Sequence, residues 1–212
     1  MTASPSDSTQ VHVDDEPGVV HPETMEESAE HRPLYGGAFT ALLPPNTRDV
    51  SDLREIPDNQ EVFVHAHTDQ SLIVELLEYQ EGMSDPDAAR YHFEDVAASN
   101  EAQGRAEVVS VEPLLLAQLS LSGCSSAWAL TGHQLVSKFN EQAQNTVKIH
   151  MALFRIPQHA TDLLVTFNDP VSHDPSSSSS VSVSSGVSSP WTLDDFHRLL
   201  CSFQLQDPGV FG

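Results

Sequence analysis

The middle of the chain alternates between apolar and polar residues with the two-residue period of a β-strand. The clearest stretches are 146–156 and 161–169. Each places large apolar side chains at every second position: Val147, Ile149, Met151 and Leu153 in the first, and Leu163, Val165 and Phe167 in the second. Only a short turn around Pro157 separates the two stretches, so the pattern predicts an antiparallel hairpin.

Three further segments, 60–67, 105–116 and 125–140, also have strand character. Segment 71–80 fits both the two-residue period of a strand and the 3.6-residue period of a helix. Alternate positions suit a strand (Leu72, Val74 and Leu76), whereas a helical spacing also occurs (Ile73, Leu76 and Leu77). We favour the strand because the neighbouring segments are strands.

Segment 85–100 follows the helical period. Pro86 suits a first helical turn. Apolar residues then recur at i, i+4, i+7 and i+8: Ala89, Phe93, Val96 and Ala97. The segment therefore predicts an amphipathic helix.

The C-terminal region predicts a second helix with a defined start. Thr192 suits the N-cap and Asp195 the third helical position of a capping box, while Trp191 faces Phe196 as a hydrophobic staple. One face is apolar: Phe196, Leu199, Leu200 and Phe203. This face must pack on something, most economically the sheet, so strands interrupted by isolated helices predict an α+β domain with a mostly antiparallel sheet.

Two segments have a biased composition. Residues 1–32 contain eight acidic residues, one basic residue and no aromatic residue, which predicts a disordered acidic tail. Residues 172–190 are rich in serine, which predicts a flexible loop. What remains, 33–212, is the length of one ordinary domain.

The chain is strongly acidic, with 31 Asp and Glu against 9 Lys and Arg and a formal net charge of −22. This charge repels nucleic acid and anionic lipid, whereas a cationic protein surface is its natural complement. The N-terminus has no apolar leader, and no stretch reaches the roughly 18 apolar residues of a membrane span. We expect a soluble cytosolic or nuclear protein.

The sequence contains no signature of catalysis. Phosphate-binding glycine motifs are absent, and Cys124 has no identifiable base. Cys124 and Cys201 lack metal or redox spacing, so we expect both to be reduced core residues. His65 and His67, with Asp69 nearby, could hold zinc, but half-exposed strand histidines are the simpler interpretation. We expect no cofactor and no metal.

Segment 49–63 concentrates carboxylates just before a strand: Asp49, Asp52, Glu55, Asp58 and Glu61. A charged run is commonly only a solvated face. Here it lies in a Pro-containing loop that feeds directly into an apolar strand, so its carboxylates are held at one edge of the core. The segment is therefore a candidate docking site for a basic partner.

Several long motifs resemble one known family. "PLYGGAFTALLPP", "DVSDLREIPDNQEVFVHAHTDQSLIVELLE", "ARYHFEDVAASN" and the closing "PWTLDDFHRLL" with "LQDPGVFG" are similar to the vertebrate Ran guanine nucleotide release factor, the Mog-type family. The similarity runs from about Pro33 to the C-terminus. The acidic tail departs from the short N-terminus associated with that family.

The resemblance implies a PsbP-like α/β/α sandwich and a non-catalytic monomer that binds the small GTPase Ran and promotes release of its nucleotide. It implies a place in nuclear transport, in nucleus and cytoplasm. An alternative is a trafficking adaptor for a voltage-gated sodium channel. In the family the docking surface is acidic, and the matching residues are Asp58 and Glu61, with Asp49, Asp52, Asp69 and Glu78 as neighbouring candidates.

Overall fold

The computed structural model describes residues 30–137, 144–172 and 189–212. Most of the predicted acidic tail and of the predicted serine-rich loop lies outside the described residues. The first strand begins at Glu30, three residues before the predicted start of the folded part, because it pairs through its backbone with the strand that follows the Gly-Gly turn. None of the described helices is long and apolar enough to span a membrane.

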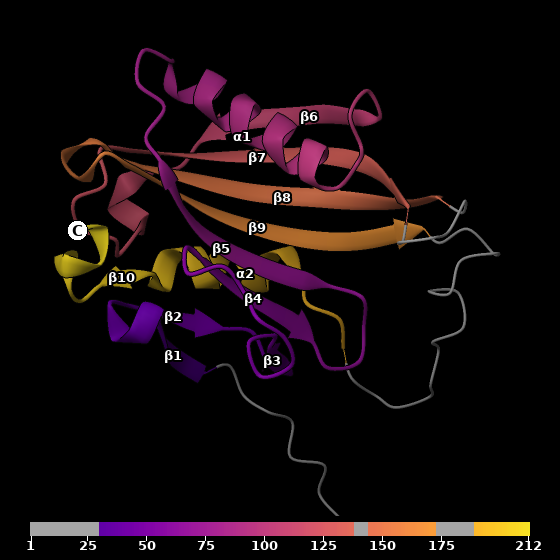
Figure 1. Cartoon of the computed structure of the whole chain (residues 1–212), viewed down its shortest axis with the longest axis horizontal. Coiled ribbons are helices and arrows are strands. Elements are labelled where there is room, and N and C mark those ends of the chain that lie inside the picture. Colours follow the sequence, from indigo (N-terminus) through magenta and orange to yellow (C-terminus); the bar gives the residue numbers. More distant parts are fainter. Residues whose placement is uncertain (1–29, 138–143, 173–188) are drawn as a thin grey trace, which may run out of the picture.

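The centre of the fold is one antiparallel sheet of seven strands in the order β3-β4-β5-β9-β8-β7-β6 (Figure 1). Its strands are β3 (Thr47–Asp49), β4 (Gln60–His65), β5 (Ser71–Glu78), β6 (Ala106–Pro113), β7 (Ser126–Ser137), β8 (Gln144–Ile156) and β9 (Thr161–Ser172). The hairpin predicted around Pro157 is confirmed as β8 and β9, and segment 71–80 forms a strand, as we favoured.

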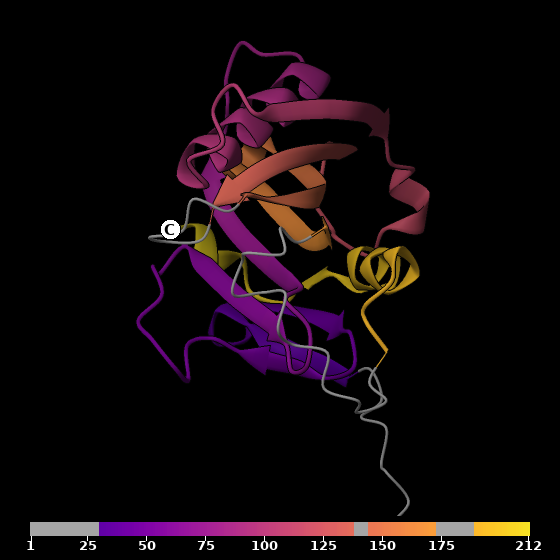
Figure 2. The same ribbon diagram turned by 90° about the vertical axis from the view of Figure 1, so that its right-hand side faces the viewer.

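A helix covers each face of this sheet, which confirms the predicted fold class. Helix α1 (Asp85–Ser99) lies over β6, β7 and β8. Helix α2 (Leu193–Ser202) lies on the opposite face beside a small sheet of three strands: β1 (Glu30–Leu34), β2 (Phe39–Leu43) and β10 (Gln204–Leu205). Figure 2 shows the large sheet edge-on between these two layers.

The predicted start of the C-terminal helix is confirmed. The Asp195 backbone N–H donates to Thr192 Oγ1 at 3.2 Å, and the Thr192 N–H donates to Asp195 Oδ2 at 2.8 Å, which is a capping box. Trp191 and Phe196 both pack on Phe167 of the sheet. The cap therefore fixes where the apolar face of α2 meets β9.

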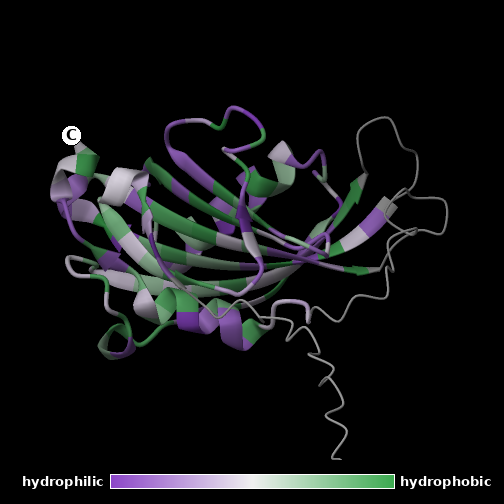
Figure 3. Cartoon of the chain, turned by 90° about the horizontal axis from the view of Figure 1, so that it is seen from below, coloured by the Kyte–Doolittle hydropathy of each residue, from purple (hydrophilic) through white to green (hydrophobic). Residues whose placement is uncertain are grey.

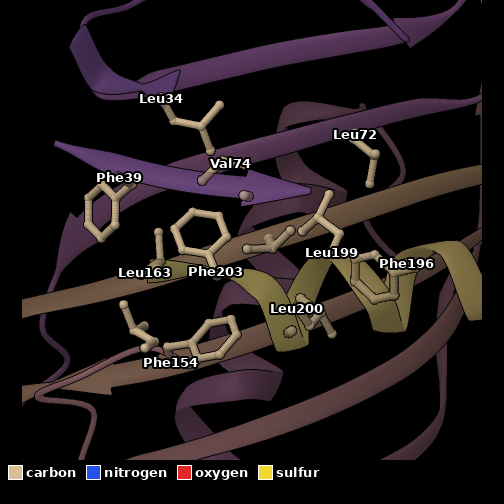
Figure 4. Packing of buried hydrophobic residues seen from close by; sticks show 14 of the residues in the cluster. Leu34, Phe39, Leu72, Val74, Phe154, Leu163, Phe196, Leu199, Leu200 and Phe203 are labelled. Atoms are coloured by element: carbon tan, nitrogen blue, oxygen red, sulfur yellow. The ribbon is translucent and has the colours of Figure 1, made fainter. Parts of the chain in front are cut away.

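Because side chains alternate along each strand, the sheet supplies two cores. On one face, α2 and the small sheet enclose a cluster that includes Phe39, Phe154, Val165 and Phe203 (Figure 4). On the other face, α1 packs Phe93 on residues that include Met151. Figure 3 shows the corresponding alternation of hydrophobic and hydrophilic residues along the strands.

The prediction that both cysteines are core residues is wrong for Cys201. Both are free, but Cys124 is half-buried and Cys201 is exposed. The buried face of α2 runs through Phe196, Leu199 and Leu200, and position 201 points about 100° away from position 200 around the helix.

A fully buried arginine joins the sheet to helix α1. Arg155 on β8 places Nε 2.8 Å from Asp162 Oδ1 on β9, which is a close ion contact without hydrogen-bond geometry. Its Nη2 donates to the Gln80 carbonyl at 2.8 Å, and its Nη1 lies 3.2 Å from Asp85 Oδ1 in the first turn of α1. The guanidinium also lies 4.0 Å from the centre of the Tyr79 ring.

We predict that Arg155→Met lowers the free energy of unfolding by about 3–5 kcal/mol, because it leaves the buried Asp162 carboxylate without its cation. Chemical denaturation measures the change. The matched control is Arg198→Met, which removes an exposed arginine from an i,i+3 pair with Asp195 and should cost less than about 1 kcal/mol. Equal losses in the two variants would contradict this role for Arg155.

Candidate functional site

Asp58 lies in a turn that the surrounding backbone holds firmly. The Gln60 N–H donates to the Pro57 carbonyl at 2.9 Å, which closes the turn around Asp58 and Asn59. The Asn59 carbonyl then accepts from the Leu76 N–H on β5 at 2.9 Å. Asp58 itself is exposed. The turn therefore presents this carboxylate to solvent from a fixed position at the start of β4.

Glu61 is half-buried on the face of β4 that the small sheet covers. Its Oε1 accepts a hydrogen bond of 2.5 Å from the backbone N–H of Tyr35, which sits in the turn before β2 with a positive φ of 50°. The Tyr35 hydroxyl reaches the carbonyls of Val74 at 2.9 Å and Asn59 at 3.1 Å. Tyr35 thus ties the turn before β2 to Glu61 on β4, to the turn that carries Asp58 and to β5.

Burial is the main cause of a raised pKa for the Glu61 carboxyl group, and the nearby charge of Asp49 raises it further, whereas the hydrogen bond from Tyr35 opposes the shift. Burial, followed by the charges of Glu61 and Glu75, also raises the pKa of the Tyr35 hydroxyl. Within the described part of the chain, no cation pairs with Glu61 or Asp49. Among the residues that the structure describes, the carboxylates of this site therefore have no compensating cation.

The fold places the remaining predicted site residues at different positions around β4. Asp49 ends β3 opposite Phe63 and accepts from the Ser51 N–H at 2.8 Å, which brings it into the cluster with Glu61. Asp52 is exposed in the loop between β3 and β4. Glu78 is exposed at the end of β5, at the same end of the hairpin as Asp58.

Asp69 does not belong to this group. It lies in the turn that joins the other ends of β4 and β5, roughly 15–20 Å along the strand direction from Glu61 at about 3.3 Å per residue. The structure therefore places Asp49 close to Glu61, keeps Asp58 in the turn that leads into β4 with Glu78 at the same end of the hairpin, and separates Asp69 from Glu61.

His65 is held by its neighbours at both ring nitrogens. Its Nδ1 accepts from the His67 N–H at 3.1 Å, and its Nε2 lies 3.2 Å from the Ser189 carbonyl. Burial is the main cause of its lowered pKa, with His67 adding to the shift and the Ser189 contact opposing it. Among the residues placed by the structure, no group of three His, Cys, Asp or Glu side chains is arranged to hold a metal ion.

Sequence reasoning missed two residues at this end of the sheet. Tyr35 acts through its backbone N–H, and the only signal was its position before Gly36 and Gly37. Glu75 lies in the segment whose period was ambiguous, and its side chain points to the opposite face from Glu61.

The fold and this cluster define an α+β protein with an acidic surface around the start of β4. A family model described as Ran-interacting Mog1 protein matches residues 32–170. The chain therefore belongs to the family of Ran-interacting Mog1 proteins.

Similar proteins cover most of the chain. The Ran guanine nucleotide release factor of Danio rerio is 57% identical over 183 residues, covering 85% of this chain and 99% of the relative. The protein of the same description in Homo sapiens is 51% identical, covering 85% and 95%. The nuclear import protein mog1 of Schizosaccharomyces pombe is 33% identical, covering 84% and 98%.

A solved structure shares the fold. The crystal structure of the Saccharomyces cerevisiae Ran-binding protein Mog1p is 25% identical to this chain, with a TM-score of 0.65 over 88% of this chain and all of the other.

We predict that Glu61→Gln raises the melting temperature at pH 7. A carboxyl group whose pKa is raised on folding stabilises the fold fully below its unfolded pKa and loses that contribution as the pH rises through its folded pKa. Glutamine removes the charge but keeps an oxygen for the Tyr35 N–H. The gain should therefore vanish as the pH falls below the ordinary range of glutamate.

Thermal unfolding followed by circular dichroism across this pH range tests the prediction. Glu55→Gln is the matched control, because Glu55 is exposed in the same loop and should leave the melting temperature unchanged. A Glu61→Gln protein that is less stable than the wild type at pH 7 would show that the charge itself supports the fold.

Proposed function

We propose that this protein is a release factor for the small GTPase Ran, which docks basic residues of Ran on the acidic cluster at the start of β4. The observation that carries the proposal is the pair of Asp58, exposed on a braced turn, and Glu61, half-buried without a cation in the described chain. Family membership and the names of the relatives support Ran as the partner.

The mechanism follows from how small GTPases hold their nucleotide. A phosphate-binding loop, its lysine and a Mg²⁺ ion concentrate the affinity in a few charge contacts. Carboxylates that engage basic groups of Ran near the nucleotide compete for these contacts and stabilise the open or nucleotide-free form. By linkage, a protein that binds the empty form more tightly weakens nucleotide binding by the same factor.

No covalent bond is made or broken in this scheme, so the protein acts as a regulator and needs no catalytic residue. The rigidity of the site matters, because Asp58 and Glu61 are fixed before Ran arrives and little freedom is lost on docking. The net charge of −22 further speeds the encounter with a basic surface. The step belongs to nuclear transport, a role that the name of the fission yeast relative supports.

We predict that Asp58→Lys and Glu61→Lys each abolish the acceleration of nucleotide release from Ran. Loss of one desolvated member of an interfacial charge pair costs about 2–5 kcal/mol, roughly a 30-fold or greater loss of affinity. The measurement is the rate at which a fluorescent guanine nucleotide leaves Ran, with and without this protein, at low and at high salt. Wild-type acceleration should fall as salt rises.

The matched control is Glu112→Lys, which makes the same change of charge on β6, at the other edge of the large sheet. It should retain the acceleration. Glu61→Gln removes the charge but keeps the acceptor for the Tyr35 N–H. A loss of acceleration in this variant therefore reports lost docking and not lost folding. Equal activity of wild type and both lysine variants would refute the site. A folded wild-type protein that binds Ran without any acceleration would refute the release activity and leave a docking adaptor.

A further inference from the structure

A groove lies on the face of the large sheet that carries helix α1. The helix crosses β6, β7 and β8 and leaves the same face of β4 and β5 uncovered (Figure 1). Side chains of β4, β5 and β9 form the floor of the groove, and the last two turns of α1 form one wall. The groove is on the opposite face of the β4–β5 hairpin from Glu61, since Glu61 faces Val74 and the groove residue Gln60 faces Glu75.

The floor of this groove contains polar atoms without partners. Thr166 is only 1% exposed, and its hydroxyl has no hydrogen bond within the described chain. Asn168, two residues further along β9, donates through Nδ2 to Ser71 Oγ at 3.0 Å, but its shielded Oδ1 accepts nothing from the described residues. Buried polar atoms are nearly always satisfied, so this pair points to a ligand that supplies donors.

The groove is also acidic. Glu75 accepts from Gln60 Nε2 at 2.7 Å, and Asp95 on α1 lies at the rim. Burial is the main cause of the raised pKa of Glu75; the Gln60 bond opposes it, Asp95 adds to it and His92 opposes it. His92 itself is engaged elsewhere, with its Nε2 2.9 Å from Asp162 Oδ2 in the buried network. No cation among the described residues pairs with Glu75.

The side chains that line the groove indicate which kind of ligand it can bind. The groove offers acceptors in the Glu75 and Asp95 carboxylates and in Asn168 Oδ1, and the Thr166 hydroxyl can accept or donate. A positively charged ligand that is rich in donors fits this lining best. Apolar side chains, among them Ile73 and Leu164, line the space between these acceptors and suit an aliphatic stem. The volume of about 120 Å³ is well below the roughly 300–1,000 Å³ of small-molecule pockets.

We propose that this groove is a second docking site, which receives the side chain of one arginine from a protein partner. A guanidinium group has five donors in a planar fork, which matches several acceptors spread around an apolar slot better than the compact ammonium group of lysine does. The proposal does not rest on binding to Ran, because the acidic cluster around Glu61 faces the small sheet on the other side of the hairpin.

The test uses N-acetyl-argininamide as the probe and N-acetyl-citrullinamide as its neutral isostere, titrated into the isotopically labelled full-length protein without Ran. We expect saturable NMR shifts centred on Ile73, Thr166 and Asn168, with a Kd in the millimolar range that suits a single side chain. The citrulline probe should give no comparable shifts. Equal shifts from both probes, or no saturable shift from arginine, would overturn the proposal.

Two variants connect binding to the residues. Glu75→Gln keeps the acceptor for Gln60 and should weaken arginine binding about tenfold or more, because the charged acceptor is lost. Thr166→Val is nearly isosteric and should weaken it several-fold while raising the melting temperature, since it removes an unpartnered buried hydroxyl. Glu112→Gln on the far edge is the control. Unchanged affinity in both groove variants would show that arginine binds elsewhere.

Discussion

The buried ion contact between Arg155 and Asp162 is the constraint on which the arrangement of this molecule depends. A buried charge must be paired. Arg155 contacts Asp162 on β9, the Gln80 carbonyl after β5 and Asp85 in the first turn of α1. His92, about two turns further into α1, reaches the same Asp162 carboxylate. The network therefore fixes where α1 starts and how it crosses the sheet. As a result, the same face of β4 and β5 stays uncovered.

The β4–β5 hairpin keeps a half-buried glutamate on each of its faces. Glu61 is covered by the small sheet and held by the Tyr35 backbone, and Glu75 lies in the groove beside α1 and is held by Gln60. Burial raises the pKa of both carboxyl groups, which means that their charges oppose folding at neutral pH. Perturbed carboxylates without a cation are a common mark of functional sites. The positive charge of a basic partner would stabilise these carboxylates and so offset the cost of burying them.

Much of the fold was predictable from local patterns. The β8–β9 hairpin, the helix at 85–99 and the capped C-terminal helix each follow from a period or a cap within about fifteen residues. The small three-stranded sheet was not predictable, because β10 has only two residues and pairs with β2 from the other end of the sequence. The exposure of Cys201 was also missed, since it depends on the orientation of α2 on the sheet.

The candidate site divides in the same way. By itself, the sequence determined the acidic character of the protein through its composition, the fold class through short-range periods, and the family through long motifs that resemble it. It also marked the segment around Asp58 and Glu61 as a candidate docking site. Only the tertiary structure decided that Asp69 lies apart, that Tyr35 holds Glu61, and that Glu75 and Thr166 share a groove with α1. Tyr35 and Glu61 are 26 positions apart, and Glu75 and Thr166 are farther apart still. Such residues meet only through strand register and helix crossing, which are set by packing over the whole sheet.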